Sequence, residues 1–134
     1  MTAPAERLSQ DASLLDAALT FRRTGFRHLP VVDANRVVGI ISDGDVQRLS
    51  PSLLGNVSQE EYNGILENTI LKQIMTHDPV TVAPETQLRE AAGILKNRKV
   101  GCLPVVQDGN LIGIITAIDM LSALLLLLDG AGKE

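Results

Sequence analysis

The chain is poor in the residue types on which many functional sites depend. Its 134 residues include one cysteine, two histidines, two phenylalanines and one tyrosine, and no tryptophan. A single cysteine, Cys102, excludes a disulfide framework and a cysteine-rich metal site. With so few aromatic residues the chain offers no stacking platform for single-stranded bases. Its core must therefore be built from Val, Ile, Leu and Ala.

Charge and hydrophobicity exclude further classes of protein. The net charge is −4, whereas a nucleic-acid surface needs a clustered basic stripe. The longest apolar run, residues 120–128, is interrupted only by Ser122 and is too short to cross a bilayer. The N-terminus lacks the apolar core of a signal peptide. We therefore expect a soluble, cytoplasmic protein with no nucleic-acid or membrane partner.

The residues also give little support for catalysis. His28 and His77 fall in no metal-ligand spacing, and the chain contains no nucleophile elbow, Walker loop or GxGxxG motif. Because a nucleophile with an oriented base is missing as well, the chain is not expected to be an enzyme. We predict no catalytic residue, no metal ion and no covalently required cofactor.

What the chain does contain is an internal repeat. Residues 28–32 (HLPVV) return as residues 102–106 (CLPVV), and residues 39–45 (GIISDGD) return as residues 113–119 (GIITAID). Both pairs are offset by 74 residues, and the same ungapped register gives eleven identities over residues 14–45. A constant offset predicts one supersecondary unit built twice. We expect the two units to pack about a pseudo-twofold axis, with a ligand groove between them.

Each repeat is predicted to run helix, strand, strand, helix, in an α/β (α+β) fold with a small sheet packed by helices. Apolar residues at helical spacing begin each repeat, and a short strand is expected at residues 80–82. We place repeat one at 1–50, a linker at 51–73 and repeat two at 74–130, together one domain over 1–130. The linker is predicted to hold a short helix that begins with a capping box at Ser58, and to be punctuated elsewhere by Pro51, Gly55 and Gly64.

The pattern also predicts which apolar residues are buried. The first helix of each repeat presents one apolar face to the sheet, and the paired strands are expected inside. The helix positions are Leu14, Ala17, Ala18 and Phe21, and in repeat two Leu88, Ala91, Ala92 and Leu95. The strand positions are Val31, Val32, Ile40, Ile41, Val105, Val106, Ile114 and Ile115.

A hydroxyl and a carboxylate follow the second strand of both repeats. These pairs are Ser42 with Asp45 and Thr116 with Asp119. Both pairs fit the capping of a helix, in which each side chain satisfies a free backbone N–H. They also fit ligand binding, because a carboxylate at a groove can accept both hydroxyls of a ribose. The residues themselves leave the two interpretations open.

Arg27 and the last helix carry two further hypotheses. Arg27 precedes the first strand of repeat one, where a guanidinium can hold a phosphate in forked geometry. It can equally be an exposed arginine, and its counterpart is Gly101, so the two sites cannot be equivalent. Residues 124–128 are five leucines, which cover every side of a helix. Such a helix is either buried all round or covered by a partner.

Together, the doubled LPVV, the doubled Gly-Ile-Ile-(Ser/Thr)-x-x-Asp and the sequence Ile-Met-Thr-x-x-Pro-Val-Thr-Val at residues 74–82 resemble a tandem CBS-domain pair, or Bateman module. The stretch at residues 42–52, followed by an acidic linker helix, is similar to the CBS portion of acetoin-utilisation B-type proteins. This resemblance implies a regulatory module that senses AMP, ADP, ATP or S-adenosylmethionine and pairs into a homodimer. An effector protein that responds is implied but not identified.

The resemblance also implies roles for single residues. Asp45 and Asp119 would bind ribose with Ser42 and Thr116 beside them. Arg27 would contact phosphate and Val80 would line the adenine pocket of the Asp45 site. The alternative is a structural or dimerisation module whose grooves stay empty and whose capping boxes only cap.

Overall fold

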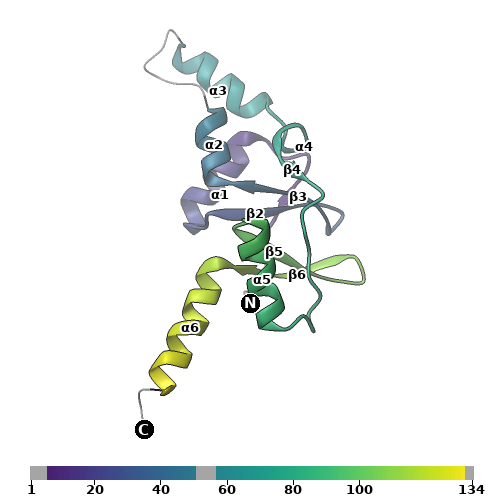
Figure 1. Cartoon of the computed structure of the whole chain (residues 1–134). Helices are drawn as coiled ribbons and strands as arrows, with labels where there is room; N and C mark the ends of the chain where they lie inside the picture. Colours follow the sequence, from purple (N-terminus) through teal and green to yellow (C-terminus); the bar gives the residue numbers. More distant parts are fainter. Residues whose placement is uncertain (1–5, 51–56, 132–134) are drawn as a thin grey trace. The chain divides into compact units, whose positions relative to one another are not determined.

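A computed structural model describes residues 6–50 and 57–131 of the chain. The chain divides into two compact units, Glu6–Pro79 (the N-terminal unit) and residues 80–131 (the C-terminal unit). Each unit has its own hydrophobic core, and the predicted order of helix, strand, strand, helix is found in both (Figure 1). The expected mixed α/β fold of two similar repeats is confirmed.

The N-terminal unit is a small sheet with helices packed against it. Its first strand runs parallel to the second, the second and third form an antiparallel hairpin, and the fourth pairs with the third. In chain order the elements are β1 (Leu8–Ser9), α1 (Leu14–Thr24), β2 (His28–Asp33), β3 (Arg36–Ser42), α2 (Asp43–Leu49), α3 (Gln59–Asn68), α4 (Leu71–Ile74) and β4 (Thr76–His77).

Helix α1 shows how local sequence sets the limits of an element. Ser13 and Asp16 form a capping box at its start, with hydrogen bonds of 3.0 and 3.1 Å. Gly25 ends the helix in the left-handed region at φ 72°, where a residue without Cβ is favoured. The face that carries Leu14 and Ala17 is fully buried. The helix thus packs through the apolar face that the sequence predicts, and its capping box and Gly25 set its two ends.

The segment predicted as a linker contributes to the N-terminal unit. Helices α3 and α4 bring Leu66 and Leu71 into its core, and Tyr62 packs against them. The backbone N–H of Leu71 donates to the carbonyl of Ala12 at 2.9 Å, which ties α4 to the start of α1. Helix α3 begins after Ser58 as predicted. Of the predicted capping box the structure forms one half, in which the Ser58 hydroxyl accepts from the N–H of Glu61 at 3.1 Å.

The structure corrects the prediction for one glycine of this segment. Gly64 was expected in irregular chain but lies inside α3, because the packing of α3 on α1 outweighs the low helix propensity of a single glycine. Pro51 and Gly55 lie outside the described residues. After the linker, His77 belongs to β4 and pairs with Gly39 of β3.

Gly39 is the one place where strand β3 needs a glycine for close approach. A Cβ built there would lie 2.3 Å from the Met75 sulfur and 2.9 Å from the carbonyl oxygen of Thr76. Met75 is itself buried in the core of the unit. The repeated glycine of the Gly-Ile-Ile motif therefore lets the chain after α4 cross β3 closely.

The C-terminal unit repeats the hairpin with its two helices. The turns of both hairpins contain two residues at positive φ, Ala34 and Asn35 in one and Asp108 and Gly109 in the other. The third strand predicted at residues 80–82 is reduced to a single parallel bridge between Val82 and Val105. The elements of the unit are α5 (Leu88–Arg98), β5 (Cys102–Gln107), β6 (Asn110–Thr116) and α6 (Ala117–Ala131).

The burial predictions hold for most positions. Of the strand residues, Val31, Val32, Ile41, Val105 and Ile114 are buried. The remaining three are only half-buried, although Ile115 packs against the core of its unit. These three are Ile40, Val106 and Ile115.

The helix face of repeat two was predicted incorrectly at Leu88. This side chain is 52% exposed, whereas its counterpart Leu14 is fully buried. Helices α3 and α4 follow repeat one and supply core residues beside Leu14. The described part of the C-terminal unit has no counterpart of α3 and α4, so Leu88 lacks the equivalent cover.

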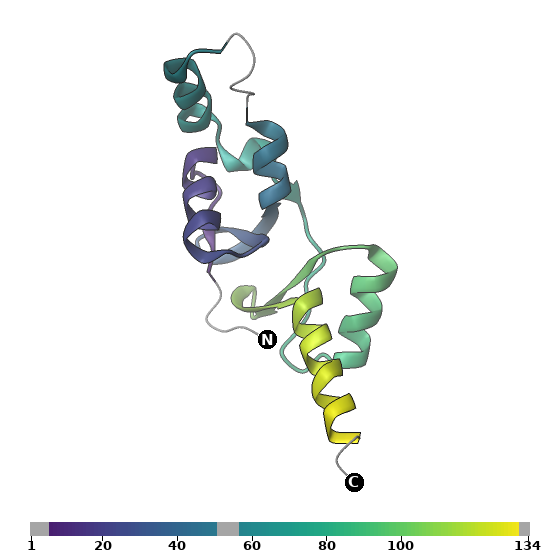
Figure 2. The same cartoon turned by 90° about the vertical axis from the view of Figure 1, so that its left-hand side faces the viewer.

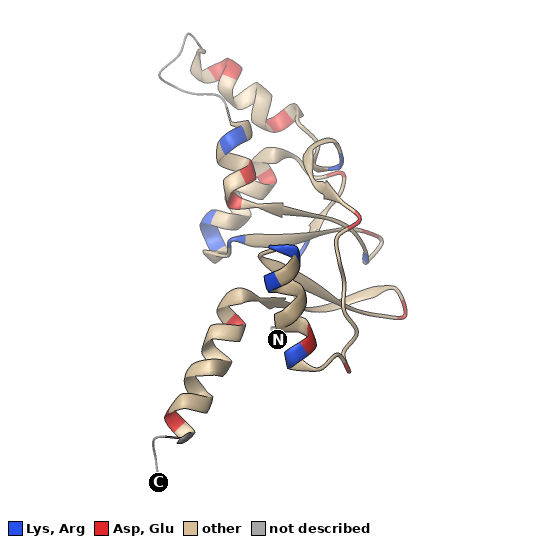
Figure 3. Ribbon diagram, viewed as in Figure 1, with Lys and Arg blue, Asp and Glu red and all other residues tan. Residues whose placement is uncertain are grey.

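Helix α6 is the least covered element of its unit. Its second half extends past α5 (Figure 2), and acidic residues occur only near its two ends (Figure 3). The five leucines at residues 124–128 are between 49% and 74% exposed, on all sides of the helix. The unit itself therefore does not bury them. Among the described residues, no helix is both long and apolar enough to span a membrane.

Candidate functional site

The hydroxyl–carboxylate pair of repeat one forms a complete capping box. Strand β3 ends at Ser42, whose extended backbone turns the chain into α2. The N–H of Asp45 donates to the Ser42 hydroxyl at 3.0 Å, and the N–H of Ser42 donates to Asp45 Oδ2 at 2.9 Å. Both side chains are half-buried. The box thus holds the Asp45 carboxylate in place at the end of the sheet.

Repeat two builds the same arrangement. The N–H of Asp119 donates to the Thr116 hydroxyl at 3.2 Å, and the N–H of Thr116 donates to Asp119 Oδ2 at 2.9 Å. Like the first pair, these side chains are half-buried. The capping interpretation of both motifs is confirmed, and it leaves acceptor positions on each carboxylate oxygen unused.

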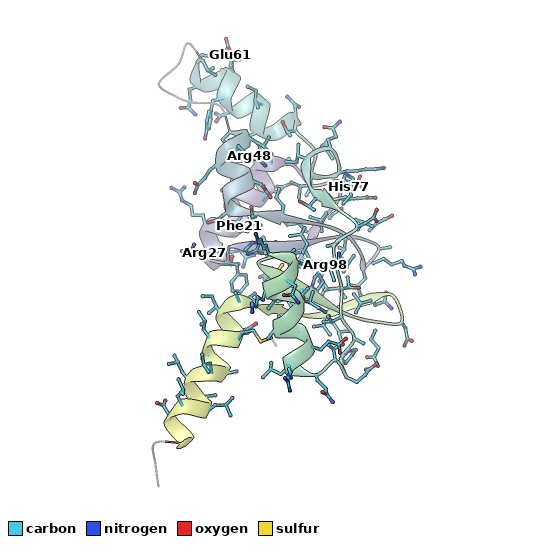
Figure 4. The ribbon with its side chains drawn as sticks, viewed as in Figure 1. Phe21, Arg27, Arg48, Glu61, His77 and Arg98 are labelled. Atoms are coloured by element: carbon cyan, nitrogen blue, oxygen red, sulfur yellow. The ribbon has the colours of Figure 1, made fainter. Side chains whose placement is uncertain are left out.

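The backbone joins each box to the residue before the preceding hairpin. The N–H of Asp43 donates to the carbonyl of Arg27 at 3.0 Å, and the N–H of Ala117 donates to the carbonyl of Gly101 at 3.3 Å. The side chain of Arg27 is exposed (Figure 4). The backbone of Arg27 is therefore tied to the strand–helix junction of repeat one, where repeat two has a glycine.

His28 adds a titratable group beside the first box. It stands opposite Ser42 in the β2–β3 pairing and is half-buried. Burial lowers the pKa of His28, while the carboxylates of Asp43 and Asp45 partly offset this and Arg27 adds to it. The imidazole is therefore held toward its neutral form, in which it both donates and accepts a hydrogen bond.

Arg48 is a further neighbour of Asp45 that the motif did not single out. Its Nη2 donates to Asp45 Oδ1 at 2.9 Å, and its side chain is 65% exposed while that of Asp45 is 26% exposed. The i, i+3 spacing on a helix was the signal available in the sequence. Repeat two has Ser122 at the equivalent position.

The remaining predicted site residue, Val80, lies in the other unit from Asp45. It is half-buried and packs against the core of the C-terminal unit, two residues before the bridge formed by Val82. The structure thus brings Arg27, Ser42 and Asp45 together in one unit, and Val80, Thr116 and Asp119 belong to the other. The contact of Val80 with an adenine ring at the Asp45 site stays a prediction.

Neither a metal site nor a reactive thiol is found among the described residues. No group of three or more His, Cys, Asp or Glu residues within 6–50 and 57–131 could hold a metal ion. Cys102 is 2% exposed, and burial raises the pKa of its thiol to about 12. Since the reactive species is the thiolate, this cysteine behaves as a small buried apolar residue.

The fold and the two boxes define a class of small, doubled α/β module with a fixed carboxylate at the end of each hairpin. A family model described as the CBS domain matches residues 1–52 and 71–126. The chain belongs to the CBS-domain family, whose paired domains are regulatory modules.

Solved structures agree with this assignment over nearly the whole chain. A Vibrio cholerae protein designated an acetoin utilization protein (AcuB) is 32% identical with a TM-score of 0.79, covering 100% of this chain and 93% of that one. The protein CBSX2, solved in complex with AMP, is 31% identical with a TM-score of 0.78, covering 94% of this chain and 93% of that one.

Among curated proteins, an uncharacterised protein of Methanocaldococcus jannaschii is 37% identical over 120 residues. The match covers 88% of this chain but only 41% of that protein. Some other curated relatives are enzymes, and this chain spans 21%, 22% and 33% of their lengths. The similarity therefore concerns only part of the length of these enzymes.

Proposed function

We propose that this chain binds an adenine nucleotide (AMP, ADP, ATP or S-adenosylmethionine) and regulates an effector protein in the cytoplasm. The observation that carries the proposal is the pair of fixed carboxylates, Asp45 and Asp119, each with unused acceptor positions at the end of a hairpin. Support comes from CBSX2, which was solved in complex with AMP.

The Asp45 site is proposed as the tighter of the two. Asp45 would accept the two ribose hydroxyls beside Ser42, and the Arg27 guanidinium would meet a phosphate. Val80 would pack on the base. At the second site Thr116 and Asp119 would meet the ribose, but Gly101 offers no cation for a phosphate.

Isothermal titration calorimetry with each of the four ligands tests the proposal. Asp45→Asn keeps an oxygen that can accept from the Ser42 N–H but removes the charge and one acceptor. Because a hydrogen bond to a charged group contributes about 1.5–3 kcal/mol, we expect at least a tenfold loss of affinity. The matched variant Asp119→Asn should cost less at the tighter site.

One observation favours a second candidate function, a structural module with empty sites. Each carboxylate already has a role, because Oδ2 of both Asp45 and Asp119 accepts a backbone N–H of its own capping box. If the wild-type protein binds none of the four ligands, or if Asp45→Asn binds as tightly as the wild type, the boxes only cap and this second function holds.

We also propose that the protein forms a homodimer through α6. Five consecutive leucines that are 49–74% exposed need cover in water, and the absence of charge along the middle of the helix suits a second copy of the same surface. Light scattering should give twice the monomer mass. Leu125→Glu should give a monomer, whereas the control Leu88→Glu, at a side chain that is 52% exposed against 60% for Leu125, should stay dimeric.

A further inference from the structure

We propose that Arg48 is a positioning residue for ribose recognition, which orients the Asp45 carboxylate and has no equivalent beside Asp119. The inference rests on the proposed nucleotide binding and deepens it. It starts from the only side-chain ion pair that the described residues show at either capping box, Arg48 Nη2 to Asp45 Oδ1 at 2.9 Å.

The hydrogen bonds of Asp45 leave a matched pair of acceptor positions free. Oδ2 accepts from the N–H of Ser42 at 2.9 Å, and Oδ1 accepts from Arg48 at the same distance. A carboxylate offers about four lone-pair positions, so one remains on each oxygen. That is the arrangement a vicinal diol needs, since its two hydroxyls can each donate to a different oxygen.

Arg48 gives the Asp45 carboxylate a second hydrogen bond, which the capping box alone does not provide. The terminal torsion of an aspartate is broad, so one hydrogen bond to Oδ2 holds the carboxylate at the end of the hairpin but constrains the rotation of its plane only in part. A second bond to Oδ1 fixes that plane before the ligand arrives, which lowers the entropy lost on binding. Asp119 has the first bond to Thr116, but Ser122 is too short and uncharged to replace the second.

The exposure of Arg48 limits the size of the effect. Its side chain is 65% exposed, and exposed ion pairs are weak because water and salt screen them. We therefore expect Arg48→Ser, which copies the residue of repeat two, to weaken binding by about threefold to fivefold. Arg48→Lys keeps the charge but loses the planar fork, so it should retain part of the affinity.

The experiment compares AMP, adenosine and 2′-deoxyadenosine by calorimetry. If Arg48 positions Asp45, Arg48→Ser weakens AMP and adenosine by the same factor and reduces the preference for adenosine over 2′-deoxyadenosine. A residue needed only for folding would not change that preference. Arg22→Ser is the matched control: it removes an exposed arginine from the last turn of α1, and it should leave all three affinities unchanged.

A gain-of-function variant sharpens the test. Ser122→Arg places a guanidinium three residues after Asp119, and it should tighten adenosine binding at the second site. Three results would overturn the inference while leaving nucleotide binding intact: unchanged affinities in Arg48→Ser, a loss for AMP without a loss for adenosine, or tighter binding. A wild-type protein that binds no nucleotide would overturn the proposed function together with it.

Discussion

The N-terminal and C-terminal units share one sequence pattern, yet their first helices differ in how they are held. Helix α1 begins with the capping box of Ser13, and its Leu14 is fully buried. Helix α5 follows Gln87, whose side chain makes no capping hydrogen bond, and its Leu88 is 52% exposed. The two helices nevertheless have the same length and the same register within the repeat.

The C-terminal ends of α1 and α5 also differ, and the end of α5 is again the less favourable one. Gly25 and Lys99 are equivalent positions, and both adopt the left-handed conformation, at φ 72° and 54°. Glycine adopts it at little cost, whereas lysine is strained there. The repeated pattern therefore determines the backbone of both units, and residues outside the pattern determine how stable each helix is.

The largest change in stability is expected from substitutions that test whether α3 and α4 shield Leu14 from water. Leu14→Ala removes a fully buried side chain, so it should lower the free energy of unfolding by about 2–5 kcal/mol. Leu88→Ala removes a side chain that is already half in water, and should cost about 0.5 kcal/mol or less. Urea denaturation of both variants measures the difference. Equal losses would mean that Leu88 is covered in solution.

A smaller change in stability is expected from substitutions at the C-terminal ends of α1 and α5. Gly25→Ala should lower the free energy of unfolding by about 1 kcal/mol, because alanine is strained at positive φ. Lys99→Gly should raise it by about 0.5 kcal/mol, since the relief of strain is partly offset by the entropy of a new glycine. Thermal melts give both values. As a control, Gly93→Ala inside α5, where a Cβ meets nothing within 4 Å, should be stabilising.

The smallest effect is a dependence on pH that only the N-terminal unit should show. Because burial lowers the pKa of His28 in the folded protein, its neutral form is favoured by folding. This contribution is complete above the unfolded pKa of about 6.5 and is lost as the pH falls toward the folded pKa. The nearby carboxylates partly offset the shift, so the effect stays small.

Unfolding by urea at pH 7.5 and 5.5 checks this dependence. The wild type should lose more stability on acidification than His28→Gln does. At the equivalent position of the C-terminal unit, the thiol of Cys102 stays neutral over this range, because burial raises its pKa to about 12. Cys102→Ala should accordingly leave the pH dependence unchanged. If His28→Gln and the wild type respond equally to pH, the histidine is not responsible.

The local parts of the site were within reach of the sequence. A capping box depends on residues three apart in the chain, so Ser42 with Asp45 and Thr116 with Asp119 were placed correctly at the starts of helices. Arg48 lies three residues further along the same helix and could have been found by the same rule. It was missed because the motif ends at Asp45.

By itself the sequence determined the repeat, the order of helices and strands and both capping boxes, because hydrogen bonds and periodicity within about ten residues specify them. Only the tertiary structure decided that α3 and α4 complete the core of the N-terminal unit. This packing also decided that Leu14 is buried while Leu88 is exposed. Burial depends on which distant segment covers a helix face, and the spacing of apolar residues in that helix carries no information about the segment.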